Sequence, residues 1–309
     1  MHHIVNVLQK RAQKNPHQEA VLYLEDGEQE TARCSYFELD QQARAIAVWL
    51  QTNKLTEKRI LLLYPAGIDF VASLIGCWYA GAIAVPVPCP KVDEFGKQQA
   101  LINRIAQDAD VAAVMTTSLY QVPLAALLTK GIPVLATETL EQANAANYQV
   151  PVLRKDAIAY LQYTSGSTSA PKAAIVSHEN LQHSLKETIN AWSYTPTSIT
   201  LNWAPHTHVY GLVCGILIPL YHGTRAIIMP PAAFINKPIV WLAALSSYQV
   251  SHSGCPNFGY DLCVRHINET ELLGLNLSQW QVAVNGGDVV QQQTLTAFVL
   301  FLTGDRRNR

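Results

Sequence analysis

The stretch RILLLYPAGIDFVASLIGCWYAGAIAVPVP (residues 59–88) indicates a buried strand, a buried helix and a second buried strand. Residues 59–65 form a short apolar run that is typical of a strand covered on both faces of its sheet. The helix is expected from about Asp69 to Tyr79, and residues 82–88 form the next strand. This order predicts two parallel strands joined by a crossover helix.

The same alternation continues along the chain in two series. In the first series, further strands are expected at 111–117 and 132–137 around a helix at 118–130. In the second series, strands are expected at 157–163 and 173–176 and near 199–203, 224–229, 249–252 and 280–285, with helices that start after Ser177 and lie near 212–220, 235–247, 257–267 and 290–302. This pattern predicts an α/β fold of mostly parallel sheets flanked by helices. The polar stretch 138–156 is the expected linker between subregions 1–137 and 157–302.

The composition excludes several classes of protein. The chain has 309 residues, of which 49% are hydrophobic and 15% charged, and its net charge is −1. These values indicate a globular protein without a basic surface for nucleic acid. No apolar run approaches the ~20 residues that span a membrane, and the N-terminus lacks the pattern of a signal peptide. Six cysteines without a CxxC spacing are expected to be reduced, which indicates a cytoplasmic protein.

The stretch LQYTSGSTSAPKAAIVSHENL (residues 161–181) follows a predicted strand and has the composition of a phosphate-binding loop. Gly166 allows the backbone to turn several N–H groups toward an anion. The further donors and the cation of the loop are Thr164, Ser165, Ser167, Thr168 and Lys172. The glycine spacing differs from that of a Walker A motif, and Ala173 follows the lysine. From these residues alone, an ordinary polar turn between strands is the alternative.

Several further segments, together with this loop, resemble adenylate-forming (AMP-binding) enzymes, whose loop reads Y-T-S-G-(S/T)-T-G-x-P-K-G. The segments before the loop, CSYFELDQQARAIAVWL (34–50) and residues 59–90, are similar to that family. After the loop, NWAPHTHVYGLVCGILIPLYHG (202–223) is similar to the region W-x-P-x-x-H-D-x-G-L. SHSGCPNFGYDLCVRHI (251–267) and WQVAVNGGDVV (280–290) complete the set, and within the family the chain most resembles fatty acyl-AMP ligases.

The resemblance implies an N-terminal adenylation domain that uses ATP and Mg²⁺. It implies conversion of a long-chain fatty acid to an acyl-adenylate, followed by transfer to an acyl carrier protein. The metal is expected to be bound largely through phosphate oxygens. In the family the chain continues for about as much sequence again and includes a mobile, lysine-bearing C-terminal domain. Because this chain is a truncated N-terminal part by that comparison, we expect its turnover to be impaired.

The resemblance also implies roles for individual residues. The triphosphate is expected to be held by Thr164, Ser165, Gly166, Ser167, Thr168 and Lys172, and adenine by Asn285, Gly286, Gly287 and Asp288. Lys172 and His208 are expected to act in catalysis, with His208 near the carboxylate of the acid. The acyl tunnel is expected beside Ser253, Gly254, Asn257, Phe258, Tyr260 and Asp261. From the residues alone, His208 is also compatible with a hydrogen-bonded core histidine, and Phe258 and Tyr260 with ordinary core residues.

Three residues differ from the family pattern. Ser169 and Ala173 occupy loop positions where the family has glycine, and Val209 occupies the position of an aspartate. Two other functions are therefore considered. One is a fatty acyl-CoA ligase, and the other is a non-catalytic fragment or pseudoenzyme that at most binds nucleotide or an acyl chain.

Overall fold

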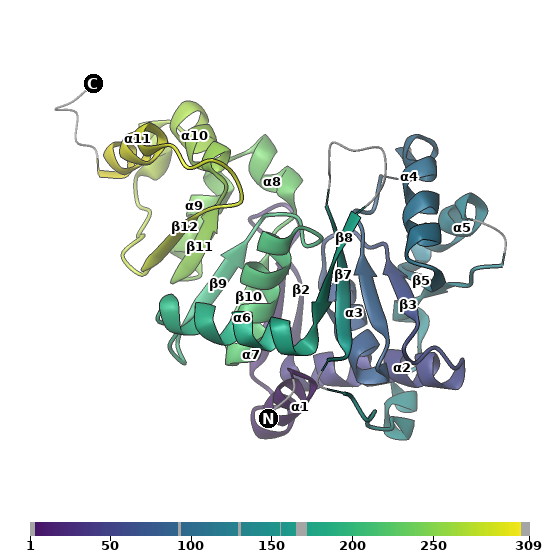
Figure 1. Ribbon diagram of the computed structural model, residues 1–309. Helices are drawn as coiled ribbons and strands as arrows, with labels where there is room; N and C mark the ends of the chain where they lie inside the picture. The colour runs from purple at the N-terminus through teal and green to yellow at the C-terminus, as the bar shows by residue number, and fades with distance from the viewer. Residues whose placement is uncertain (1–3, 92–93, 129–130, 155, 165–171, 304–309) are drawn as a thin grey trace. The chain divides into compact units, whose positions relative to one another are not determined.

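The computed structural model describes residues 4–91, 94–128, 131–154, 156–164 and 172–303, and the chain divides into two compact units. The first unit comprises Met1–Gln18 and Cys34–Glu187, and the second comprises Glu19–Arg33 and Thr188–Arg309. Within the described residues, each unit is built on a six-stranded sheet with helices packed around it (Figure 1). The predicted α/β fold is therefore confirmed. The polar stretch 138–156 lies within the first unit.

The first sheet has the strand order β6–β5–β3–β4–β7–β8. Its strands are β3 (Arg59–Leu62), β4 (Ile83–Pro86), β5 (Val111–Thr116), β6 (Val134–Ala136), β7 (Ile158–Thr164) and β8 (Lys172–Ser177). The pairs within β6–β5–β3–β4–β7 are parallel, whereas β8 runs antiparallel to β7. The helices of this unit are α1 (Ile4–Lys14), α2 (Tyr36–Thr52), α3 (Ile68–Ala80), α4 (Phe95–Asp108), α5 (Ser118–Leu127) and most of α6 (His178–Ala191), with short 3₁₀ helices at Thr137–Thr139 and Gln142–Asn147.

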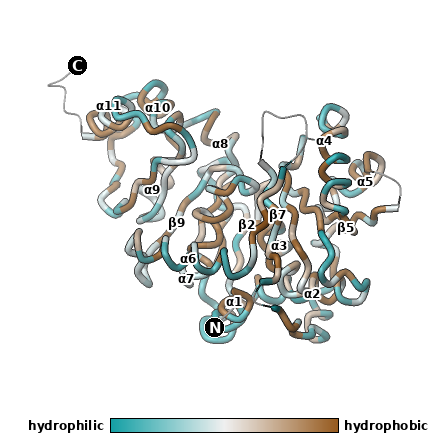
Figure 2. The backbone as a smooth tube through the Cα atoms, viewed as in Figure 1, coloured by the Kyte–Doolittle hydropathy of each residue, from teal (hydrophilic) through white to brown (hydrophobic). Residues whose placement is uncertain are grey.

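Both faces of the β3 strand are covered. Leu61 and Leu63 belong to one apolar cluster with residues of α4 and α5, and their neighbours Ile60 and Leu62 are also fully buried. Because successive side chains on a strand point to opposite faces, apolar layers must lie on both sides of the sheet. The helix α3 contacts β3, β4 and β5, and Figure 2 shows its hydrophobic character along its length.

The second sheet has the strand order β12–β11–β9–β10–β1–β2. Its strands are β1 (Glu19–Leu24), β2 (Glu30–Ser35), β9 (Ile199–Asn202), β10 (Arg225–Ile228), β11 (His252–Cys255) and β12 (Val282–Asn285). The pairs from β12 through β1 are parallel. Its helices are a π-helix at Tyr210–Leu217, α7 (Ile218–His222), α8 (Pro231–Asn236), α9 (Ile239–Ser247), α10 (Asn257–His266), a 3₁₀ helix at Glu269–Leu272 and α11 (Gln292–Thr303).

An aromatic cluster forms the core of the second unit. Trp203 stacks on Phe234 with ring centroids 3.9 Å apart, and Trp241 packs edge-on against Phe234 at 5.7 Å. Phe298 of α11 packs edge-on against Tyr260 of α10 at 4.9 Å. Aromatic pairs at these separations add to the stability that burial alone provides. The cluster therefore holds α8, α9, α10 and α11 together around the β9 and β11 end of the sheet.

Several elements differ from the sequence prediction. The helices α1 and α4 were not predicted, because their buried apolar residues are sparse within polar sequence. The strand expected at 249–252 begins at His252, because Gln249 has a φ of 51° and belongs to the turn that ends α9. The helix expected at 212–220 begins as a π-helix and only its last part is α-helical.

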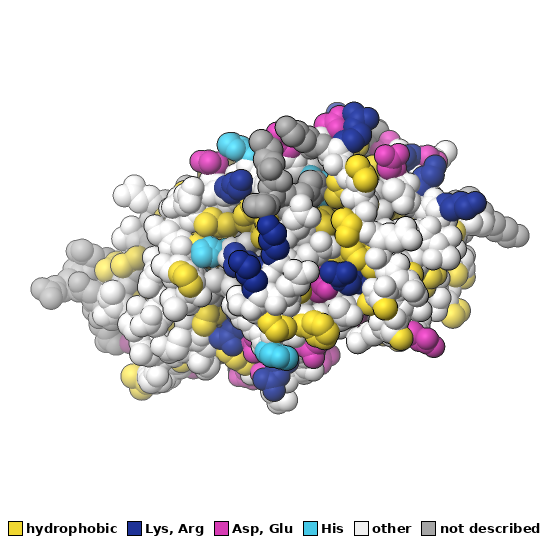
Figure 3. All heavy atoms as spheres, turned by 90° about the horizontal axis from the view of Figure 1, so that it is seen from below, with side chains coloured by type: hydrophobic (Ala, Val, Ile, Leu, Met, Phe, Trp, Pro, Cys, Tyr) yellow, Lys and Arg dark blue, Asp and Glu magenta, His cyan; other side chains and the backbone are white. Residues whose placement is uncertain are grey.

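The surface carries charges of both signs, as Figure 3 shows for one face. Charges of both signs are expected for a chain whose net charge is −1. In the described ranges, none of the helices has the length and hydrophobicity that a membrane crossing requires.

Candidate functional site

The predicted phosphate loop joins β7 to β8, which form an antiparallel hairpin. Thr164 is the last residue of β7, Lys172 is the first residue of β8, and the two are paired across the ladder. The loop residues Ser165, Gly166, Ser167 and Thr168 lie outside the described residues. Lys172 is exposed. The ladder therefore fixes the backbone position of Lys172.

The other predicted site residues lie in the second unit, and His208 and the residues from Asn285 to Asp288 lie at the carboxyl edge of its sheet. The strands β9, β11 and β12 are adjacent and parallel, so their carboxyl ends share one edge. β10 lies on one side of β9 and β11 on the other. In open α/β sheets this change of direction leaves a crevice at the carboxyl edge, where ligands bind.

Three loops converge at this edge. A Cβ atom placed on Gly287 would lie 3.8 Å from Cε1 of His208 and 4.0 Å from Cγ of Pro256. Gly287 follows β12, His208 follows β9 and Pro256 follows β11. The structure therefore brings together His208 and Gly287, two residues that the sequence analysis placed in separate motifs.

The imidazole of His208 is exposed, and one of its two nitrogens already has a hydrogen-bond partner. Its Nδ1 accepts a hydrogen bond from the backbone N–H of Tyr210 at 3.2 Å. A neutral ring that accepts at Nδ1 carries its proton on Nε2. The Nε2–H group is thus available to donate to an anionic oxygen. Val209, which replaces the aspartate of the family pattern, is exposed and adds no charge here.

Asn257 and Asn285 link α10 to the loop that follows β12. Oδ1 of Asn257 accepts from Nδ2 of Asn285 at 3.3 Å and from the backbone N–H of Gln291 at 3.0 Å. Nδ2 of Asn257 donates to Oγ1 of Thr294 at 3.1 Å. Oδ1 of Asn285 is buried, and it has no hydrogen-bond partner among the residues that the structure describes. A buried acceptor without a partner costs free energy, so a donor from a ligand would stabilise this position.

The loop from Gly286 to Asp288 is open toward this edge. A Cβ on Gly286 would meet no atom within 4 Å, and Gly287 has a φ of +83°, which favours glycine. Oδ1 of Asp288 accepts from the backbone N–H of Val289 at 2.7 Å. The two glycines therefore leave room for a ligand to approach the backbone closely.

The residues predicted beside the acyl tunnel have different environments. Ser253 is buried, with its Oγ donating to the carbonyl of Leu201 at 2.7 Å and accepting from Nε1 of Trp241 at 2.9 Å. A Cβ on Gly254 would lie 2.0 Å from the carbonyl oxygen of Val284, so β11 and β12 approach closely at this position.

The remaining tunnel candidates lie on α10. Tyr260 is buried and its hydroxyl donates to the carbonyl of Val284 at 2.8 Å, while Phe258 is 47% exposed. Asp261 forms an ion pair with Arg265 at 2.8 Å on the helix surface. Of the six candidates, Ser253 is the one that lines the cavity described next.

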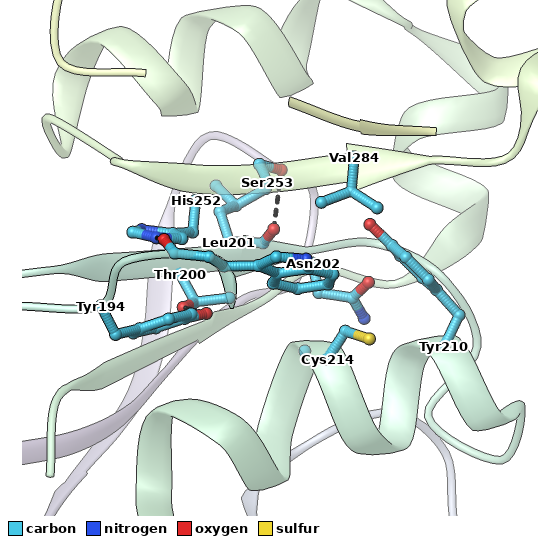
Figure 4. A pocket seen from close by; sticks show the side chains of 11 residues that line it. Tyr194, Thr200, Leu201, Asn202, Tyr210, Cys214, His252, Ser253 and Val284 are labelled. Atoms are coloured by element: carbon cyan, nitrogen blue, oxygen red, sulfur yellow. Dashed lines mark hydrogen bonds between the residues drawn. The ribbon is translucent and has the colours of Figure 1, made fainter. Parts of the chain in front are cut away.

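A narrow cavity lies behind the carboxyl edge, wholly within the second unit (Figure 4). It encloses about 240 Å³ when its open mouth is included. Tyr210 lies at one end, and Tyr194 and His252 lie at the other. The cavity passes Cys214, whose thiol has its pKa raised by burial to about 12 and is therefore protonated at neutral pH.

The far end of the cavity is closed by a stacked pair. The rings of Tyr194 and His252 are 4.0 Å apart at 27°. Nε2 of His252 lies 2.8 Å from the carbonyl of Trp192, and Nδ1 lies 2.8 Å from Oγ of Ser251. Because a carbonyl only accepts, Nε2 carries the proton and Nδ1 accepts from the serine hydroxyl. Burial lowers the pKa of His252 below 6.5, which favours this neutral form.

The sequence analysis missed Tyr210, Cys214 and His252 as cavity residues. The segment GLVCGIL is wholly apolar and therefore predicts only a buried helix. Its π-helical register, which sets the side chains that face the cavity, leaves no periodic signal in so short a run. The link from Asn257 to Gln291 was also missed, because it joins two separate motifs.

Comparison with known proteins identifies the protein family of this chain. The chain belongs to the AMP-binding enzyme family, whose sequence pattern matches residues 8–305. Among individual relatives it is similar to the medium-chain-fatty-acid–(acyl-carrier-protein) ligase JamA of Moorena producens, with 39% identity over 302 residues. That match covers 96% of this chain and 51% of the relative. A putative fatty-acid–CoA ligase, fadD21 of Mycobacterium bovis, is 30% identical over 96% of this chain and 53% of its own length.

A solved structure resembles the whole of the fold. The fatty acyl-adenylate ligase from L. pneumophila, in complex with acyl adenylate and pyrophosphate, superposes with a TM-score of 0.92 at 34% identity. The match covers 98% of this chain and 53% of that chain. The chain thus spans about half the length of the relatives that it matches.

Proposed function

We propose that this chain binds ATP and a fatty acid and joins them as an acyl-adenylate. In this reaction a carboxylate oxygen attacks the α-phosphorus of ATP, a new P–O bond forms, and pyrophosphate leaves. The reaction depends mainly on the positioning of the reactants and on neutralisation of charge. Membership in the AMP-binding family and the likeness to fatty-acid ligases support the proposal.

One observation of the structure carries the nucleotide assignment. At the carboxyl edge of the second sheet, the Oδ1 atom of Asn285 is buried without a hydrogen-bond partner among the described residues, and an open glycine turn follows it directly in the chain. An adenine amino group is a donor that fits such an acceptor, and the glycines allow a flat ring to lie close to the backbone. Asn285, Gly286, Gly287 and Asp288 are therefore proposed to hold the adenine.

The phosphates are proposed to bind at the β7–β8 hairpin. Lys172 would neutralise charge on the leaving pyrophosphate, and the hydroxyls and backbone of Thr164, Ser165, Gly166, Ser167 and Thr168 would hold its oxygens. Mg²⁺ would supply further neutralisation through phosphate oxygens.

His208 is proposed to orient the carboxylate. Its Nε2–H would donate to one carboxylate oxygen and leave the other free to attack. His208 is well placed for this role because it lies at the same edge as the proposed adenine site. Lys172 and His208 are thus the two catalytic residues of the proposal.

The proposed acceptor of the acyl group is an acyl carrier protein. The relatives include a carrier-protein ligase and a putative CoA ligase, so CoA is the second candidate. A cytoplasmic setting belongs to the same proposal, because none of the six cysteines, all within the described ranges, forms a disulfide.

The proposal is tested by incubating the chain with ATP, Mg²⁺ and octanoate, and measuring pyrophosphate and octanoyl-adenylate by mass spectrometry. Formation of both in equal amounts supports it. Binding of ATP without either product would indicate the non-catalytic alternative. Adding holo-carrier protein or CoA in parallel then identifies the acceptor from the thioester formed.

The adenine assignment has its own test. Inosine triphosphate lacks the amino group of ATP, so the wild-type chain should bind it roughly tenfold or more weakly. In Asn285→Asp, an acceptor oxygen remains although the hydrogen bond from Nδ2 to Asn257 is lost, so the preference should persist even where the overall affinity falls. In Asn285→Leu, the preference should disappear, and its persistence would overturn the assignment.

A further inference from the structure

The loop that carries His208 from β9 to the π-helix is held at its start by the side chain of Asn202. Asn202 is the last residue of β9 and is 2% exposed. Its Nδ2 donates to the carbonyl of Ala204 at 2.9 Å, and its Oδ1 accepts from the backbone N–H of the same residue at 3.2 Å. One buried amide therefore fixes both backbone groups of a residue that lies outside strand and helix.

The π-helix packs directly on this amide and on the loop. A Cβ atom placed on Gly215 would lie 2.5 Å from Cγ of Asn202, and one placed on Gly211 would lie 2.2 Å from the carbonyl oxygen of Pro205. Side-chain carbons do not approach other atoms this closely, so the helix lies on the loop without a gap. Because a rotated amide would leave a buried donor and a buried acceptor unpaired, the orientation of Asn202 is fixed from both sides.

The same loop and helix hold the backbone of His208. The carbonyl of Pro205 accepts from the backbone N–H of His208 at 2.9 Å, and the carbonyl of His208 accepts from the N–H of Leu212 at 2.9 Å. The N–H of Tyr210 in turn fixes the imidazole through Nδ1. The direction of Nε2–H therefore depends on the loop that Asn202 orders and on the helix that packs against Asn202.

We propose that Asn202 is a positioning residue for adenylate formation and that it acts through His208. The inference rests on the proposed function and extends it. By ordering the backbone of Ala204 and Pro205, the amide sets the place from which Nε2–H of His208 meets the carboxylate. The rate is sensitive to this placement, because an error of about 1 Å can cost about 100-fold. Asn202 also lines the narrow cavity, so the test must separate an effect through His208 from a direct one.

The test is a double-mutant cycle on the formation of octanoyl-adenylate from ATP, Mg²⁺ and octanoate. Asn202→Leu keeps a side chain of similar shape and removes both hydrogen bonds to Ala204. In the wild-type background it should lower kcat about 10- to 100-fold and leave the KM for ATP unchanged, because the proposed adenine site is separate. In the His208→Ala background it should lower kcat by less than about twofold, because the group that Asn202 positions is gone.

Thr116→Val is the matched control for a loss of stability. It removes a buried hydrogen bond from Thr116 to the carbonyl of Leu63 in the first unit, so it should lower the melting temperature and leave kcat unchanged. If thermal melts show that Asn202→Leu does not fold, Asn202→Ala takes its place in the same cycle.

Three outcomes would contradict the inference. An equal loss of kcat in the wild-type and His208→Ala backgrounds, or an unchanged kcat in the Asn202 variant, would overturn the positioning role while the proposed function stands. Failure of the wild-type chain to form octanoyl-adenylate would overturn the proposed function, and the positioning role with it.

Discussion

Thr164 and Lys172 are directly paired residues of the antiparallel β7–β8 ladder. They flank residues 165–171 of the predicted phosphate loop, which lie outside the described residues. The two ends of the loop are therefore held at the separation of neighbouring strands. This closure makes the position of the Lys172 backbone independent of the loop sequence, so loop and lysine can be tested separately.

Removing the lysine should affect phosphate binding and not stability. Lys172→Ala is expected to weaken ATP and pyrophosphate by roughly 10- to 100-fold, the range for a charge-assisted contact. Because Lys172 is exposed, the melting temperature should change little. Lys186→Ala, at an exposed position of α6, is the matched control and should bind normally. Similar losses in both variants, measured by calorimetry, would contradict a specific role.

Ala173 and Ser169 occupy positions where the family has glycine, and changing each of them to glycine should have a different effect. Ala173 is paired with Tyr163 within the ladder, where alanine is tolerated, so Ala173→Gly should destabilise the hairpin by about 0.5–1 kcal/mol. Ser169 lies outside the described residues, and the family has glycine there. If that position requires a positive φ, Ser169→Gly should tighten ATP binding. ATP titrations of both variants measure the affinity. Tighter ATP binding by Ala173→Gly alone would show that position 173, and not position 169, needs glycine for ATP binding.

Gly254 should be essential for folding, unlike the nearby Gly286. A Cβ on Gly254 would lie 2.0 Å from the carbonyl oxygen of Val284, so Gly254→Ala must separate β11 from β12. We expect a loss of about 3 kcal/mol or more in the free energy of unfolding. Gly286→Ala, which meets no atom within 4 Å, should change it by about 0.5 kcal/mol or less. Urea denaturation measures both, and equal losses would refute the close contact.

Asn257 should position the proposed adenine site. Asn257→Ala removes the acceptor for Asn285 and for the backbone of Gln291, so it should lower both stability and ATP affinity. A stability loss of about 1–3 kcal/mol is expected for the groups left unpaired. Thr294→Val removes only the contact with Thr294 and should leave ATP affinity unchanged. Calorimetry and thermal melts separate the two effects, and normal ATP binding by Asn257→Ala would exclude a positioning role.

Stability should decrease in acid partly through His252. Burial lowers its pKa in the folded state below 6.5, while the unfolded chain titrates near that value. The unfolded state therefore binds more protons between the two values, and stability falls as the pH decreases through this window. His252→Gln should flatten the decrease of the melting temperature as the pH falls below about 6.5, relative to the wild type. An unchanged pH dependence would contradict this contribution.

Much of the fold could be predicted from the sequence, because buried parallel strands carry a strong local signal. Residues 60–62 form a continuous apolar run that follows the basic Arg59, and residues 59–62 form β3 as expected. The strand β11 was placed three residues early, because Ser253 and Gly254 are small or polar although fully buried. Their burial depends on the partners β9 and β12, and local sequence does not carry that information.

The candidate site was predictable in its parts but not in its connections. Motifs located His208 and Asn285, and the structure added the geometry that places Gly287 beside His208. The side chain of Asn257 acquires its role from Gln291 and Thr294, which belong to a segment without a recognisable motif. The π-helix that begins at Tyr210 contacts β9, and no spacing of apolar residues in that stretch distinguishes it from an α-helix.

The parallel pairing of β1 with β10 has a consequence for the synthesis of the chain. Val21 pairs with Ala226, so the first strand of the second sheet must wait for a partner that is made about two hundred residues later. At 5–20 residues per second, a ribosome needs roughly 10–40 s to produce it. During this interval β2 is available on one side of β1, but the edge that pairs with β10 in the finished protein has no native partner. The nascent chain therefore presents an aggregation-prone strand for longer than its first unit needs to emerge, and chaperones that bind short apolar strands would act at this point.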